Sequence, residues 1–170
     1  MASGNTLLYL TPQAFCPPAT IAAQFDVIAG ASTPAESFPV LAFDTTTVEY
    51  ADFRCKMPQH YAGGGVTVVI CSGAGTTTGT LQWAVAFRAI KDDAEDLDTT
   101  AQTYDYNTVN IGTLPNVQGE VTYDNITFTD GADMDSVAAG DEFVLRIRRD
   151  TGSDTAAADG YLHGIEIRET

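Results

Sequence analysis

The chain is poor in basic residues and has no long hydrophobic run, and each scarcity excludes a class of partner. Its 170 residues include 8 Lys and Arg against 23 Asp and Glu, so the formal net charge is -15. A surface of this charge repels phosphate backbones, and we expect no nucleic-acid partner. No apolar run approaches the roughly 18–20 residues that cross a bilayer, so we expect no membrane partner.

Histidine is scarce too, which limits the catalytic chemistry available to the chain. Neither His60 nor His163 stands in a motif with a nucleophile, and no G-x-S-x-G is present. The glycine-rich stretch 73–79 lacks the Lys of a phosphate loop. His163 shares its period-two phase with Ile165 and Ile167, which predicts a hydrogen-bonded residue in or at the edge of the core. The sequence therefore predicts that the protein is not an enzyme.

Three cysteines, Cys16, Cys55 and Cys71, cannot all pair within one chain and show no C-x-x-C spacing. We interpret them as structural thiols, with neither a zinc site nor a redox motif.

Two acidic stretches are the candidate ligands for a hard cation. They consist of Asp92, Asp93, Glu95, Asp96 and Asp98, and of Asp150, Asp154 and Asp159 in the last loop. Oxygen-rich loops of this kind can bind calcium, but neither stretch matches the twelve-residue calcium loop. We expect solvated loops and no cofactor, with structural calcium as the alternative.

The first 35 residues differ in composition from the rest of the chain. Prolines interrupt them, and the chain start has no basic segment typical of a secretion signal, which predicts a cytoplasmic product. Two interpretations stay open: an extended N-terminal arm over residues 1–35, or the first strand of the folded body. Residues 36–170 form the predicted domain.

From residue 36 onward, alternating apolar and polar residues predict strands separated by Gly, Asp and Ser turns. The predicted strands are Pro39–Phe43, Val48–Cys55, Val66–Cys71, Leu81–Ile90, Tyr104–Ile111, Glu120–Phe128, Phe143–Asp150 and Tyr161–Arg168. The only helical candidates are single turns at Asp92–Leu97 and Met134–Ala139. The sequence thus predicts an all-β fold, a two-sheet jelly-roll sandwich of about eight antiparallel strands.

Three details of these strands bear on possible binding surfaces. Trp83, the single Trp, falls on the inward phase of its strand and is predicted to be core. Val69 and Cys71 make the second face of Val66–Cys71 apolar as well, which predicts a cover by an arm or a neighbouring subunit. The apolar phase of Glu120–Phe128 shifts, which predicts a bulge near Asp124-Asn125.

Exposed aromatic residues are what a carbohydrate-binding surface needs, and few are available. Tyr104 and Tyr106 lie beside each other on one face of a polar strand and are the best candidates.

Several phrases together resemble a family of proteins encoded among the structural genes of tailed bacteriophages. They are Met57-Pro58, Tyr61–Val68, Val85–Phe87, Asp135–Phe143 and Arg148–Asp150, and the resemblance covers roughly residues 38–170. Members are small jelly-roll virion components such as capsid decoration (cement) proteins. The resemblance carries over no catalytic residue.

The resemblance implies a capsid decoration protein that bridges shell subunits at the virion surface, assembled in the host cytoplasm. Its partners would be the major capsid protein or other virion proteins and copies of itself, with a trimer expected. An arm could add a strand to a partner's sheet through apolar anchors, namely Leu7, Leu8, Tyr9, Leu10 and Phe15. Val69 and Cys71 would be buried between subunits. The alternatives are a tail or fibre component, or a glycan-binding jelly-roll module for host attachment.

Overall fold

Two antiparallel sheets pack face to face in the computed structural model of the chain, which describes residues 4–94, 96–98, 101–107 and 111–170. The described strands are β1 (Thr6–Leu10), β2 (Gln24–Ala29), β3 (Ser37–Phe43), β4 (Tyr50–Lys56), β5 (Val66–Ala74), β6 (Thr80–Ile90), β7 (Ile111–Thr113), β8 (Thr122–Phe128), β9 (Glu142–Arg149) and β10 (Gly160–Glu169). Single 3-10 turns, η1 (Pro12–Ala14) and η2 (Ala132–Met134), are the described helical elements.

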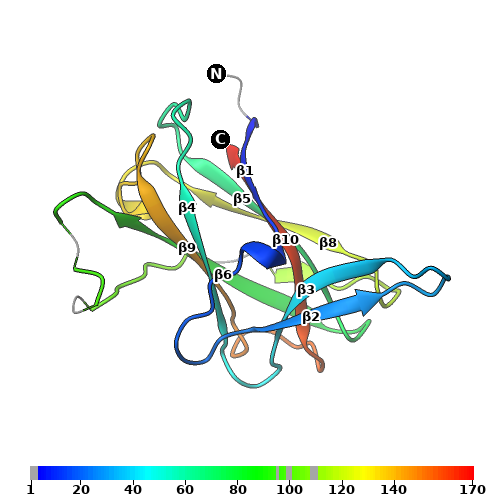
Figure 1. The fold of residues 1–170 in the computed structure, drawn as a ribbon. Helices are drawn as coiled ribbons and strands as arrows, with labels where there is room; N and C mark the ends of the chain where they lie inside the picture. Colours follow the sequence, from blue (N-terminus) through cyan, green and yellow to red (C-terminus); the bar gives the residue numbers. More distant parts are fainter. Residues whose placement is uncertain (1–3, 95, 99–100, 108–110) are drawn as a thin grey trace.

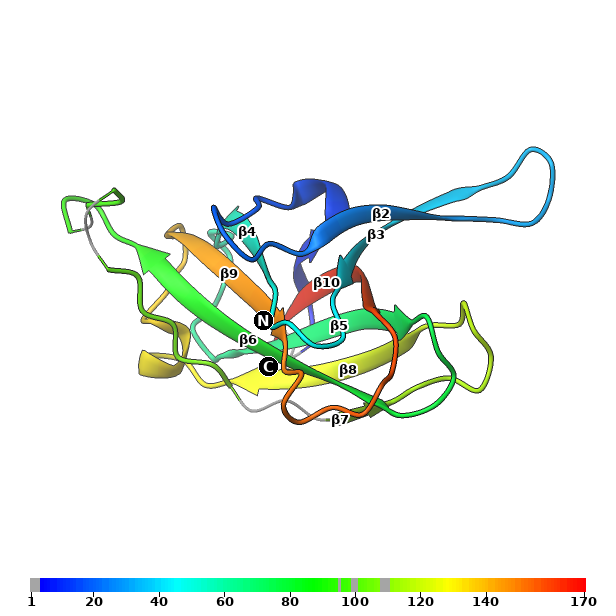
Figure 2. The same cartoon turned by 90° about the horizontal axis from the view of Figure 1, so that it is seen from below.

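The six-stranded sheet has the order β2-β3-β10-β5-β8, with β1 also paired to β10, and the four-stranded sheet has the order β4-β9-β6-β7. The predicted all-β jelly-roll sandwich is confirmed (Figure 1). The β2–β3 hairpin extends well beyond the two layers (Figure 2). No helix among the described residues is long and apolar enough to span a membrane.

Period-two alternation fills the space between the sheets. In β9 buried and half-buried residues alternate along the whole strand, with Phe143, Leu145 and Ile147 facing the core. Trp83 is fully buried, as predicted; its Nε1 donates to Ser72 Oγ at 3.1 Å, and its ring meets Phe43 edge-on at 5.0 Å. A buried indole N–H that finds an acceptor avoids the cost of an unpaired polar group.

The N-terminal segment is part of the sheet. β1 pairs with β10 from Thr6 opposite Arg168 to Leu10 opposite Ile165, so the two chain ends lie together (Figure 1). β3 pairs with the other end of the same edge of β10, at Gly160–Leu162. Of the two interpretations left open, the structure favours the first strand of the sandwich for Thr6–Leu10.

The proposed arm anchors therefore contact their own chain. Leu7 and Leu10 are buried in the core, and Leu8 and Phe15 pack against it. Tyr9, 62% exposed, is the one that points to solvent. Alternation places Leu8 and Leu10 on one side of β1, and the register shift between Thr6 and Leu8 lets Leu7 reach the core as well.

The one bulge predicted from the sequence is wrong, and a different one exists. β8 pairs with β5 without a register shift. The apolar phase shifts in the sequence only because a polar residue, Asp124, is half-buried on the inner face, while Tyr123 is 68% exposed on the outer face. One register shift lies in β10 between Leu162 and Gly164, and another lies in β1 between Thr6 and Leu8. The shift in β10 is the one that concerns His163. It turns His163 outward, so the prediction that His163 shares the inward face of Ile165 is wrong.

The predicted strand Tyr104–Ile111 is also largely absent. Residues 101–107 make a single bridge, at Asn107 opposite Val85, residues 108–110 lie outside the described part of the chain, and β7 begins only at Ile111. The tyrosines of this segment, Tyr104 and Tyr106, lie over arginines on the outer face of the four-stranded sheet. Gly140, in the turn before β9, has a φ of +84°, a conformation that favours glycine.

Candidate functional site

The outer face of the four-stranded sheet carries a cluster of aromatic and charged side chains. Residues of β4 and β9 that alternate with the core residues point away from it, among them Tyr50, Asp52, Arg146 and Arg148. The strand register places Tyr50 opposite Arg148 and Asp52 opposite Arg146. β6 places two alanines, Ala84 and Ala86, beside the same arginines, so the side chains of β6 are short at the centre of this face.

Two tyrosines from the segment after β6 lie over these arginines. The Tyr104 ring centroid is 4.0 Å from Arg146 Cζ, and the Tyr106 centroid is 4.3 Å from Arg148 Cζ. The two ring centroids are 6.2 Å apart. The Asn107 N–H donates to Val85 O at 3.0 Å and fixes the segment against β6. Tyr104 and Tyr106 therefore share one face, as the sequence predicted.

Asp52 and Arg146 form the polar centre of the cluster. Arg146 Nε and Nη2 donate to the two carboxylate oxygens at 2.6 and 2.7 Å, and both side chains are under one-fifth exposed. Burial, the largest single influence, acts to lower the Arg146 pKa, but the hydrogen bonds and charge of Asp52, together with Tyr104 and Tyr106, outweigh it and raise that pKa. Burial raises the pKa of Tyr104 and raises that of Tyr106 to about 12, so both hydroxyls stay protonated donors at neutral pH.

A groove of about 550 Å³ opens beside this cluster. It is lined by Pro18, Ala19, Thr20, Ile21, Tyr50, Asp52, Gln102 and Arg146. Its outer wall is the segment 16–22, which bonds to the free edge of β4 through Cys16 N–H to Asp52 O at 2.8 Å and Tyr50 N–H to Ile21 O at 2.9 Å.

Ile21 in this wall is an exposed β-branched residue with a φ of +56°. Such a conformation is costly for isoleucine and is found where the surrounding structure imposes it, often at binding sites. An exposed apolar side chain is thus held in the wall of the groove, which Gln102 also lines.

The groove combines the groups that recognise a sugar chain. A sugar ring has an apolar face of C–H groups, which packs on aromatic or aliphatic side chains, and a rim of hydroxyls. Tyr50 and Ile21 supply apolar contact. Gln102, Asp52 and Arg146 supply planar donors and acceptors for hydroxyls. Because Asp52 and Arg146 orient each other, little ordering remains for binding to impose.

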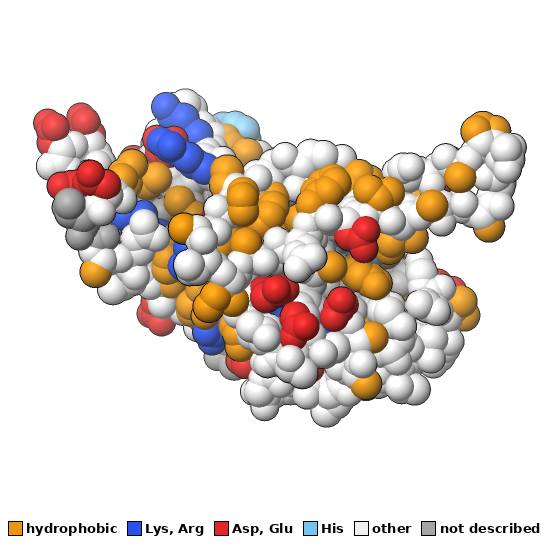
Figure 3. Space-filling view, turned by 60° about the horizontal axis from the view of Figure 1, so that its bottom comes forward, with side chains coloured by type: hydrophobic (Ala, Val, Ile, Leu, Met, Phe, Trp, Pro, Cys, Tyr) orange, Lys and Arg blue, Asp and Glu red, His pale blue; other side chains and the backbone are white. Residues whose placement is uncertain are grey.

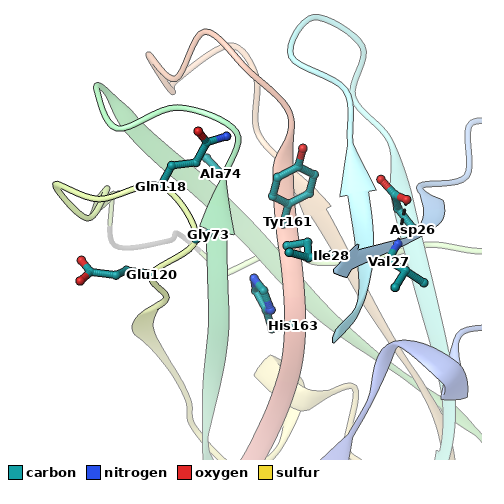
Figure 4. Close-up of a pocket in the computed structure, with 10 residues that line it drawn as sticks. Asp26, Val27, Ile28, Gly73, Ala74, Gln118, Glu120, Tyr161 and His163 are labelled. Carbon is teal, nitrogen blue, oxygen red and sulfur yellow. Dashed lines mark hydrogen bonds between the residues drawn. The ribbon is translucent and has the colours of Figure 1, made fainter. Parts of the chain in front are cut away.

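A second groove, of about 270 Å³, lies on the outer face of the six-stranded sheet. Figure 4 shows Tyr161 and His163 on β10, between Asp26 on one side and Glu120 on the other. Gly73 leaves room here, since a Cβ at this position would lie 3.4 Å from His163 Nε2. Burial lowers the His163 pKa. None of the described residues that line this groove is a Ser, Thr or Cys.

The acidic residues that the sequence offered as metal ligands do not form a cluster within the described part of the chain. Asp154 accepts from the buried Arg149, at 2.5 Å to its Nε. Within the described part of the chain no three His, Cys, Asp or Glu side chains converge on one point, and Glu95 lies outside that part. Burial raises the pKa of Cys55 to about 12 and raises that of Cys71, in keeping with structural thiols.

The predicted sheet-face contact residues lie apart from the groove. Val69 is buried and Cys71 half-buried on the outer face of the six-stranded sheet, and their proposed role between subunits stays a prediction.

The sequence did not nominate Tyr50, Asp52 or Arg146. Their signal was present, because the outward phases of β4 and β9 are mostly polar and each combines one acid with two bases. Only the pairing of the two strands shows that these phases face each other.

No protein-family model and no curated protein matches the sequence. Solved structures match in fold. The CBM22-1 xylan-binding domain of Paenibacillus barcinonensis Xyn10C aligns with a TM-score of 0.54 and 14% identity, over 99% of this chain and 97% of that one. The CBM22-2 xylan-binding domain of the same protein aligns at 0.55 and 13%, over 96% and 99%.

The CBM22-1-GH10 modules of Clostridium thermocellum Xyn10B, complexed with xylohexaose, align with a TM-score of 0.57 and 10% identity, over 100% of this chain and 29% of that one. At these identities the comparison shows a shared jelly-roll fold.

These comparisons correct the expectations drawn from the bacteriophage resemblance. The structures that share the fold are xylan-binding domains, so the predicted capsid and virion partners, with the expected trimer, are wrong, as is the virion assignment itself. The phrases that carried the resemblance are turns and alternating strands. They specify a jelly roll, and many unrelated functions use that fold.

Proposed function

We propose that this protein is a carbohydrate-binding module that holds a glycan chain on the outer face of its four-stranded sheet and has no catalytic activity of its own. The observation that carries the proposal is the groove in which Tyr50 and the oriented Asp52–Arg146 pair meet, with Tyr104 over the same guanidinium. The shared fold with two xylan-binding domains supports it.

The groove suits an extended chain better than a small enclosed ligand. It is an open trough between the segment 16–22 and the segment that carries Gln102 and Tyr104, and several sugar units could lie along it. None of the described residues that line the groove is a Cys, His or Lys, and the carboxylate of Asp52 is held in an ion pair, which is the basis for proposing binding without catalysis.

Binding to a glycan array, followed by titration calorimetry with the best ligands, tests the proposal. Xylan and mannan oligosaccharides are suitable first probes. We expect Tyr50→Ala to weaken binding at least about tenfold, because the aromatic ring that lines the groove, with its centroid 5.5 Å from Arg146 Cζ, is lost.

Tyr123→Ala is the matched control, since Tyr123 is 68% exposed on the outer face of the other sheet and should leave affinity unchanged. Absence of binding to every glycan, with the protein folded, would contradict the proposal. So would equal losses in both variants.

A further inference from the structure

The basic residues of this acidic chain gather on the face that carries the groove. All eight Lys and Arg lie in the described part of the chain, and five project outward from β4, β6 and β9. These five are Arg54, Lys56, Arg88, Arg146 and Arg148. The outward residues of the same three strands include two carboxylates, Asp52 and Glu142. In a protein of net charge -15, this face carries more positive than negative charge.

The remaining acids near the face are placed away from its centre. The loop that holds Asp92 and Asp93 projects from one end of the sheet. In Figure 3 the visible Lys and Arg side chains lie toward that end of the molecule. The β2–β3 hairpin carries no Lys or Arg. Asp105 lines a separate groove with Asp133 and Asp135.

Two arginines of this face pair with its two acids, and Arg148 has no acid partner among the described residues. Arg54 pairs with Glu142 at 2.7 Å, and Arg146 pairs with Asp52. Arg148 makes neither an ion pair nor a hydrogen bond from its buried Nε to any described residue, and its guanidinium lies over the Tyr106 ring. The Nε itself is out of reach of a ligand, but Arg148 as a whole is only half-buried, so a ligand can supply an acceptor to the remaining donors of its guanidinium.

We propose that the glycan held on this face is anionic, with a carboxylate or a sulfate ester of the sugar chain accepting hydrogen bonds from Arg148. The inference rests on the proposed function and names its substrate class. A guanidinium presents parallel N–H donors that match both kinds of anion. Tyr50, opposite Arg148 on β4, lies where the ring that bears the anion would pack.

Two pairs of polymers test the inference, each matched in backbone. Carboxymethyl cellulose is compared with hydroxyethyl cellulose, and dextran sulfate with dextran, by affinity electrophoresis and calorimetry. At least one anionic polymer should bind about tenfold or more tightly than its neutral partner, as expected of a charge-assisted hydrogen bond. Preference for the first or the second anion identifies carboxylate or sulfate as the group bound.

In Arg148→Gln, the affinities for the anionic and the neutral polymer of the preferred pair should differ by no more than about twofold. Arg148→Lys should keep part of the preference for the anionic polymer. Arg168→Gln is the control: it removes the same charge from the outer face of the other sheet and should change nothing. Raising the salt from about 0.1 M to about 1 M shortens the screening length from about 10 Å to about 3 Å and should weaken the anionic complex alone.

Equal affinity for charged and neutral polymers would overturn this inference and leave the proposed function standing. Binding to no glycan at all would contradict the proposed function. Equally tight binding of single-stranded DNA would show a general polyanion site and also overturn the inference.

Discussion

Arg149 offers the sharpest test of how this fold is held together. The side chain is fully buried, and every described contact of its guanidinium is a hydrogen bond to an acceptor. Nε and Nη2 donate to Asp154 at 2.5 and 3.1 Å, Nη2 to Ala156 O at 2.8 Å, and Nη1 to Ala158 O at 2.9 Å and Phe43 O at 3.3 Å. One side chain thus joins the end of β9 to β3 and to the last loop.

Arg149→Met keeps most of the apolar volume but removes all of these donors. The carboxylate of Asp154, whose side chain is 3% exposed, then stays buried without a counter-charge. Breaking a buried ion pair from one side costs about 3–5 kcal/mol, and in a domain of this size each kcal/mol lowers the melting temperature by about 2–4 °C. We expect the melting temperature to fall by roughly 6–20 °C.

Urea and thermal unfolding of four proteins measure this: the natural chain, Arg149→Met, Asp154→Leu and the double variant. The double variant should recover part of the loss, because the unpaired charge is then gone, and the cycle isolates the coupling. A loss below about 1 kcal/mol for Arg149→Met would refute the reasoning, as would strict additivity of the two changes.

Two more predictions concern stability. Trp83→Ala should cost about 3–5 kcal/mol in urea unfolding because it empties a fully buried site, and a near-neutral result would contradict the core assignment. Hydrogen bonds from the backbone of Thr46 and Thr47 lower the Asp44 pKa to about 2 from 3.8, so its contribution is complete above pH 3.8 and is lost as the pH falls toward 2. Asp44→Asn should therefore lower the melting temperature at pH 7 and flatten its decline between pH 4 and 2; an unchanged decline would contradict this assignment.

The sequence alone determined the strands with one buried face. Apart from Arg149, every second residue of β6 and β9 is apolar, so local alternation specifies both the element and the side that faces the core. Trp83 falls in that phase, and the structure buries it. The glycine of the Gly140 turn is likewise a local requirement, set by its φ of +84°. Tyr104 and Tyr106 could be nominated from their spacing.

The tertiary structure decided which strands are neighbours, and with them the candidate site. Asp52 and Arg146 are 94 positions apart and meet only because β4 pairs with β9 in one register. His163 turns outward because the pairing of β10 with β5 shifts register between Leu162 and Gly164. The sequence of β10 alone gives no sign of this shift. Local patterns report the environment on either side of a strand. Pairing between distant strands depends on free-energy differences summed over the whole core, so only the assembled fold places Arg148 beside Tyr50 and Ala84 on one face.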